Sequence, residues 1–93
     1  MLKDPMLEWT KRLIISWVNI NCESYKEFIY TLDLNYVEKF ILIHYFIPNN
    51  NKTKTFKEIE YELQKSHDTV MNYYTKALQK LLNSLGPRIY KDF

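Results

Sequence analysis

Polar side chains able to read nucleic-acid bases follow Ser66 at helical spacing. If residues 66–85 form a helix with Val70 facing inward, the opposite side carries only polar residues: Asp68, Asn72, Thr75, Lys76, Gln79 and Asn83. Amides can pair bidentately with adenine, aspartate can accept from cytosine, and lysine can bind guanine or phosphate. We therefore predict base contacts from one set of residues: His67, Asp68, Asn72, Thr75, Lys76 and Gln79. A polar outer face is, however, also typical of any solvated surface helix.

Lysines surround the start of this helix and of the one expected before it. Backbone amides at a helix start bind phosphate, and lysine side chains add positive charge. The predicted phosphate contacts are Lys54, Thr55, Lys57 and Lys65. Residues 51–93 hold 8 Lys/Arg and 5 Asp/Glu, whereas residues 1–50 hold 5 and 6. This mild basic bias favours a phosphate-bearing partner for the second half of the chain.

Two capped helices must position these side chains. Thr55 with Glu58 three residues later forms a capping box, and Ser66 provides a second N-cap. The turn between the two helices, "QKS", is about three residues long and contains no glycine or proline. We expect a helix-turn-helix, with its turn defined by side-chain hydrogen bonding at Ser66. The second helix is expected to end at Gly86-Pro87. Its expected apolar stripe consists of Val70, Tyr73, Tyr74, Ala77, Leu78, Leu81 and Leu85.

Three further helices are expected in the first half of the chain. Asp4 is the expected N-cap of a helix that Pro5 begins and that runs to about Ile20, with an inward stripe of Met6, Leu13, Ile14, Trp17 and Ile20. Ser24 with Glu27 predicts a cap and a short helix to about Leu32. Asn35 with Glu38 predicts a helix over 36–47 that is apolar almost all round and therefore central. A strand over 40–47 fits by propensity alone, but no partner strand is evident.

The overall prediction is an all-α, compact bundle of about five helices ending in a helix-turn-helix. We expect one domain over 1–93, with N-terminal helices in 1–33, the helix-turn-helix region in 34–86 and a tail in 87–93. Residues 48–54 form the one clear loop.

Composition excludes several classes of protein. The single cysteine, Cys22, excludes an internal disulfide, and the longest apolar run, 40–43, is too short to span a bilayer. Asp4, Pro5 and Glu8 interrupt any signal-peptide pattern, so we expect a soluble cytoplasmic protein. Cys22, His44 and His67 lack metal-ligand spacing, and no catalytic or phosphate-loop motif is present. We expect no enzyme activity, no cofactor, no metal and no membrane association.

The segment from Thr55 to Leu81 resembles region four of bacterial sigma factors, the module that reads the −35 promoter element. The pattern shared with that family, "T-x-x-E-I-x-x-x-L-x-x-S-x-x-x-V … A-L-x-K-L", covers about 27 of the 93 residues. The helix "ILIHYFI" is also similar to small phage and prophage regulators of the ArpU/RinA type. The resemblance implies a bacterial or phage-encoded transcription regulator. Its partners would be promoter-like double-stranded DNA and RNA polymerase or a second sigma-like subunit.

The sequence also departs from that family. Gln64 and Lys65 stand where family members commonly have a small residue, often glycine, and then an apolar one. The arginines that commonly open the family's recognition helix are missing, while Asp68 and Asn72 keep an acid and an amide. The resemblance therefore implies a different base preference. We also expect 93 residues to be too few to include the promoter-melting domain, so the protein is either a stand-alone regulator or works beside another subunit that supplies that domain.

Two interpretations of function follow. In the first, the protein reads promoter DNA in the major groove; in the second, it docks on RNA polymerase or a partner sigma subunit with little DNA contact. Trp9 and Trp17 bear on the second, because large aromatics favour interfaces when exposed. They either pack the first helix onto the domain or form a surface for a partner, which could be a second copy of the same chain.

Overall fold

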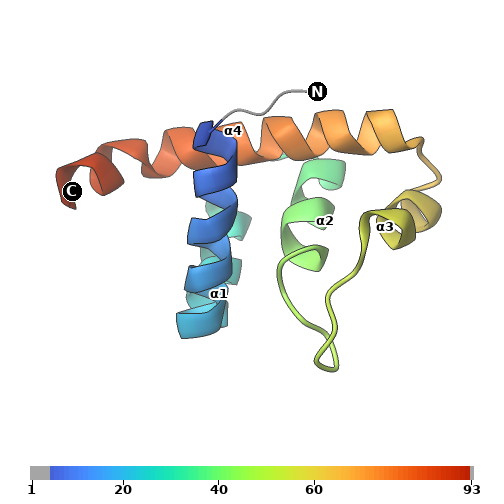
Figure 1. Ribbon diagram of the computed structural model, residues 1–93, viewed down its shortest axis with the longest axis horizontal. Helices are drawn as coiled ribbons and strands as arrows, with labels where there is room; N and C mark the ends of the chain where they lie inside the picture. Colours follow the sequence, from blue (N-terminus) through green and yellow to red (C-terminus); the bar gives the residue numbers. More distant parts are fainter. Residues whose placement is uncertain (1–4, 93) are drawn as a thin grey trace.

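Helices form the regular structure of the chain. The computed structural model describes the backbone of residues 5–92 and the side chains of residues 7–85. Four helices follow in order: α1 (Pro5–Thr31), α2 (Tyr36–His44), α3 (Phe56–Leu63) and α4 (His67–Asp92) (Figure 1). Across residues 5–92 no strand is present, so the all-α prediction is confirmed. The structure has four helices instead of the expected five or so.

The number differs because the first two expected helices belong to one element. α1 bends sharply at Asn21, whose backbone is non-helical (φ −155°, ψ 85°). Oδ1 of Asn21 accepts a hydrogen bond from the Ser24 N–H at 3.1 Å, so Asn21 caps the second segment. The cap predicted at Ser24 is wrong. Its Oγ instead accepts a bond from Nε1 of Trp17 at 3.2 Å, which joins the two segments.

The capping box predicted at Asn35 is confirmed in full. The Asn35 side chain accepts from the Glu38 N–H at 2.9 Å, and Glu38 Oε1 accepts from the Asn35 N–H at 3.0 Å. The helix ends at His44, earlier than the predicted 47, although the Tyr45 and Ile47 amides still bond to carbonyls four residues back. α2 packs against α1, α3 and α4, as expected of a central helix.

A tight hairpin leads from α2 to α3. Asn49 and Lys52 exchange two backbone hydrogen bonds, at 2.9 and 3.2 Å. Asn50 and Asn51 between them have positive φ of 56° and 66°, which asparagine tolerates better than most residues. The hairpin tip lies at the far end of the molecule from α4 (Figure 1).

One hydrophobic core lies beneath α4. α1 contributes Ile14, Val18, Tyr25 and Ile29, α2 contributes Ile41 and Leu42, and α3 contributes Ile59. The stripe predicted for α4 is buried, with Tyr73 only partly so: Val70, Tyr74, Ala77, Leu78, Leu81 and Leu85. Burial raises the pKa of Tyr25, whose hydroxyl donates to the Leu42 carbonyl at 2.7 Å.

Ile20 departs from its expected place in this core, because its side chain is 84% exposed. It stands six residues after Ile14, about 600° of helical rotation, and so lies well away from the buried face. The predicted inward stripe of the first helix is therefore wrong at this position. Met6 and the cap expected at Asp4 lie outside what the structure describes.

α4 also differs from its prediction at the C-terminus. It continues through Gly86 and Pro87 to Asp92, so the stop predicted at these two residues is wrong. A proline removes one backbone donor from a helix but does not always end it. Across residues 5–92, no helix is long and apolar enough to cross a membrane.

Candidate nucleic-acid interface

The connection between α3 and α4 is three residues long and begins with a left-handed residue. Gln64 has φ 53° and ψ 48°, and it is the C-cap of α3. The Gln64 amide bonds to the Tyr61 carbonyl at 3.2 Å and the Lys65 amide to the Glu60 carbonyl at 3.1 Å. These two bonds satisfy carbonyls at the end of α3 and reverse the chain. The helix is thus stopped by backbone geometry at Gln64, a feature that the sequence interpretation missed.

Ser66 then starts α4, as predicted. Its Oγ accepts from the Thr69 N–H at 3.2 Å and donates to the Thr69 hydroxyl at 2.8 Å, while its carbonyl accepts from the Val70 N–H. The expectation that Ser66 defines the turn alone is corrected, because Gln64 ends one helix and Ser66 begins the next. At the start of α3, the capping box of Thr55 and Glu58 is confirmed.

The outer face of α4 carries the predicted polar stripe. Asp68, Asn72, Lys76 and Gln79 are exposed and repeat every three or four residues, so they share one face of the helix. Thr75 lies at the edge of this stripe and is half-buried. Val70, on the opposite side, is fully buried and fixes the orientation of the helix. The structure thus brings these five predicted residues together.

His67 is exposed but does not share this face. At 100° per residue it stands about 60° from Val70, on the side that meets α3. Its Nδ1 lies 2.7 Å from Oε2 of Glu60, and this contact ties the first residue of α4 to α3. The arrangement suits His67 to holding the two helices together rather than to reading a base beside Asp68.

The predicted phosphate contacts differ in their availability. Lys54 donates to Glu62, and this hydrogen bond is the main cause that raises the pKa of Lys54. The Thr55 amide is engaged by Oε1 of Glu58, a bond that lowers the pKa of that carboxyl. Lys57 is exposed and Lys65 half-buried; neither forms an ion pair within residues 7–85. Of the four, Lys57 and Lys65 are therefore best placed to meet a phosphate.

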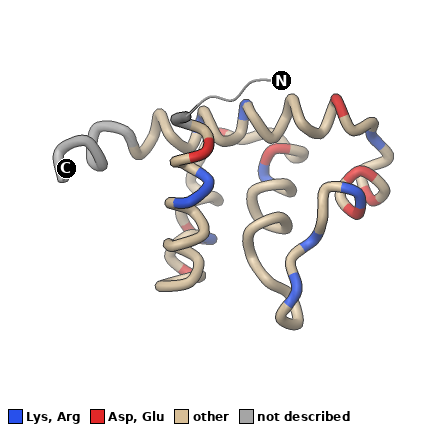
Figure 2. The backbone as a smooth tube through the Cα atoms, viewed as in Figure 1, with Lys and Arg blue, Asp and Glu red and all other residues tan. Residues whose placement is uncertain are grey.

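Charge around the turn is balanced. Residues 52–68 contain four lysines and four carboxylates, a formal net charge of zero. Along this part of the chain three lysines come first, three glutamates follow on α3, and Lys65 and Asp68 come last (Figure 2). Two of the acids are used internally, since Glu60 meets His67 and Glu62 meets Lys54. Long-range attraction to a polyanion is consequently weak here.

A second ion pair anchors the other half of α4. Nζ of Lys80 lies 2.8 Å from Oε1 of Glu38, whose side chain is only 1% exposed. The two residues are 42 apart in sequence, and no local pattern predicts their pairing. This contact fixes α4 to the N-terminal end of α2, and Lys80 is therefore part of the scaffold.

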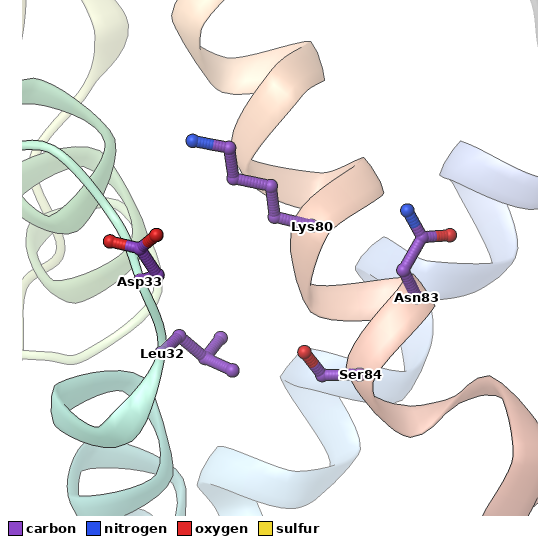
Figure 3. A pocket seen from close by; sticks show the side chains of 5 residues that line it. All are labelled: Leu32, Asp33, Lys80, Asn83 and Ser84. Carbon is purple, nitrogen blue, oxygen red and sulfur yellow. The ribbon is translucent and has the colours of Figure 1, made fainter.

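A shallow hollow of about 300 Å³ opens beside Lys80. It is lined by Leu32 and Asp33 after α1 and by Lys80, Asn83 and Ser84 of α4 (Figure 3). Because the Lys80 ammonium is held by Glu38, we assign no ligand to this hollow.

The tryptophans predicted as a partner surface are both half-buried. The Trp17 ring packs against Tyr25 and Phe28, with centroids at 5.5 and 5.3 Å, and thereby holds the two segments of α1 together. Trp17 is also one of the partly buried residues that pack against the core, as expected of a residue that packs α1 onto the domain. Trp9 lies two turns earlier on α1.

Comparisons of the chain with known protein families, with curated proteins and with solved structures find no match. The likeness of residues 55–81 to sigma region four therefore rests on the residue pattern alone.

Proposed function

We propose that the protein is a small transcription regulator or sigma-like subunit that binds double-stranded DNA through α3 and α4. In this proposal the two helices act as a helix-turn-helix, with α3 as the brace and α4 in the major groove. One observation carries it: an exposed, wholly polar stripe on α4 begins directly after a three-residue turn. Such a role places the protein in the cytoplasm of a bacterium or of a phage-infected cell.

Each residue has a role in this proposal. Asn72 and Gln79 carry amides suited to adenine, Asp68 can accept from cytosine, and Lys76 can reach guanine or a phosphate. Thr75 makes a flanking contact at the edge of the stripe. Lys57 and Lys65 bind backbone phosphates and set the register of α4 on the duplex.

Selection from a pool of randomised duplexes, followed by fluorescence anisotropy on the enriched sequence, tests this function. We expect Asn72→Ala to weaken binding about tenfold and to relax preference at one base position. Lys76→Ala should weaken binding and reduce its salt dependence. Asn19→Ala, at an exposed position on α1, is the matched control and should bind as the wild type does. Failure to enrich any duplex at low salt would refute the proposal.

The charge balance of residues 52–68 favours a second function, docking on RNA polymerase or a partner sigma subunit. A neutral surface attracts DNA weakly but suits a protein interface. Affinity capture from a bacterial extract, with polymerase subunits identified by mass spectrometry, tests this alternative. Capture of polymerase together with absence of duplex binding would favour it over the first.

A further inference from the structure

The most exposed aromatic side chain recorded for the protein lies on α3, outside the polar stripe of α4. Tyr61 is 85% exposed, and its ring contacts no other ring among the described residues. An aromatic ring left in water loses the hydrophobic stabilisation that burial would bring. Tyr61 is not required by the core, which α3 reaches through Ile59. Its position therefore suggests a ligand that is planar or apolar.

Two lysines stand four residues before and four residues after Tyr61 in the sequence. Lys57 precedes Tyr61 by four residues, one helical turn along the same face of α3. Lys65 follows by four residues, and its amide is bonded to the Glu60 carbonyl, which folds the turn back onto the end of α3. Within residues 7–85 neither lysine forms an ion pair. We call Lys57, Tyr61 and Lys65 the α3 face.

We propose that the α3 face binds unpaired nucleic acid, with a base stacked on Tyr61 and adjacent phosphates on Lys57 and Lys65. Aromatic side chains combined with cations are the groups with which proteins bind single strands, because every base has a π face and every linkage a charge. The inference goes beyond the proposed duplex recognition, since no residue of the α4 stripe takes part. Only Lys57 and Lys65 take part in both the proposed duplex binding and the proposed single-strand binding.

The carboxylates of α3 limit how much electrostatic attraction contributes to the binding of a single strand. Glu58 is held by Thr55, Glu60 by His67 and Glu62 by Lys54, so their carboxylates already have partners. These three carboxylates outnumber the two lysines of the α3 face, so this surface has no net positive charge. Stacking should therefore contribute more than phosphate contacts, and binding should tolerate different sequences. Two phosphate contacts predict a shallow salt dependence, with a slope of about 1.4.

Fluorescence anisotropy with labelled single strands of oligothymidine and of mixed sequence tests the proposal. We expect the wild type to bind both, Tyr61→Ala to bind about tenfold more weakly, and Tyr61→Phe to bind as the wild type does. Tyr36→Ala removes another exposed tyrosine and serves as the matched control. A bromouracil-substituted strand should photocrosslink to the peptide containing Tyr61.

Further outcomes separate this inference from the proposed function. Asn72→Ala should weaken duplex binding and leave single-strand binding unchanged, whereas Tyr61→Ala should do the reverse. The proposal is overturned if the wild type binds no single strand at low salt, or if Tyr36→Ala loses as much affinity as Tyr61→Ala. It is also overturned if Tyr61→Ala abolishes capture of RNA polymerase while single-strand binding persists, because the α3 face would then be a protein-docking surface.

Discussion

Replacement of Gln64 by glycine should stabilise the protein. Gln64 has φ 53° and ψ 48°, the left-handed region in which a Cβ clashes with the following carbonyl. That conformation costs a non-glycine residue about 1–2 kcal/mol, and glycine avoids this cost. Glycine also has more freedom in the unfolded chain, which offsets about 0.5–1 kcal/mol. The net gain therefore lies between about 0 and 1.5 kcal/mol, with a central value of about 0.75 kcal/mol.

The gain should be visible in both thermal and urea unfolding followed by far-ultraviolet circular dichroism. In a domain of this size, about 1 kcal/mol corresponds to roughly 4–8 °C in Tm, so the central value for Gln64→Gly corresponds to a rise in Tm of about 3–6 °C. The hydrogen bonds of the turn use only backbone amides and carbonyls, and glycine retains them.

Gln79→Gly is the matched control, because Gln79 is also exposed but lies within α4. Glycine inside a helix should cost about 1 kcal/mol. The same substitution is thus expected to act in opposite directions at the two sites. If Gln64→Gly lowers Tm as Gln79→Gly does, Gln64 is not left-handed in solution and the account of the turn is refuted.

Three further predictions concern the scaffold. Lys80→Met should destabilise the protein by about 1–2 kcal/mol in urea unfolding, because Glu38 is buried and loses its charged partner, whereas Lys76→Met should change stability little. Tyr25→Phe should cost about 1–2 kcal/mol in the same assay, since the buried Leu42 carbonyl loses its donor; an unchanged midpoint would contradict this. The pKa of Glu58 is lowered in the folded state, so its contribution is present above the unfolded pKa and is lost as the pH falls through the folded one. Stability measured below about pH 5 should therefore fall less steeply in Glu58→Gln than in the wild type.

The features predicted from sequence were those determined by a few neighbouring residues. The boxes at Asn35 and Thr55 each depend on two side chains three positions apart, and both are present. The buried and polar faces of α4 follow from helical periodicity alone. The number of helices was wrong because Asn21 took the cap that the Ser24–Glu27 pattern predicted. Both Asn21 and Ser24 are residue types that cap helices. The hydrogen bond from Trp17 that occupies the Ser24 hydroxyl is a tertiary contact, which the local pattern does not predict.

Other features of the structure could not be predicted from the sequence, for physical reasons. No propensity rule places glutamine in the left-handed region, although its position in the family pattern, where glycine is common, was a usable signal. The ion pair of Glu38 and Lys80 joins residues 42 apart, so it depends on how α2 and α4 pack. The pairing of Lys54 with Glu62 likewise required the path of the hairpin before α3. For this reason the prediction from sequence included Lys54 among the cations available to bind phosphate.

The number of available cations bears on which proposed function is dominant. Lys54 and Lys80 are held in ion pairs, and Lys52 lies in the hairpin before α3, which leaves Lys57, Lys65 and Lys76 near the turn and the α4 stripe. At about 0.9 units of salt slope per neutralised phosphate, three contacts give a slope of roughly 2.7. A protein that makes about 6–10 such contacts gains much more affinity from counterion release. A monomer with three should hold a duplex weakly, so docking on a partner and reading DNA would be complementary. The partner would supply affinity and α4 the sequence preference. A measured slope well above 3 would show that cations outside this surface take part, and would remove the need for a partner.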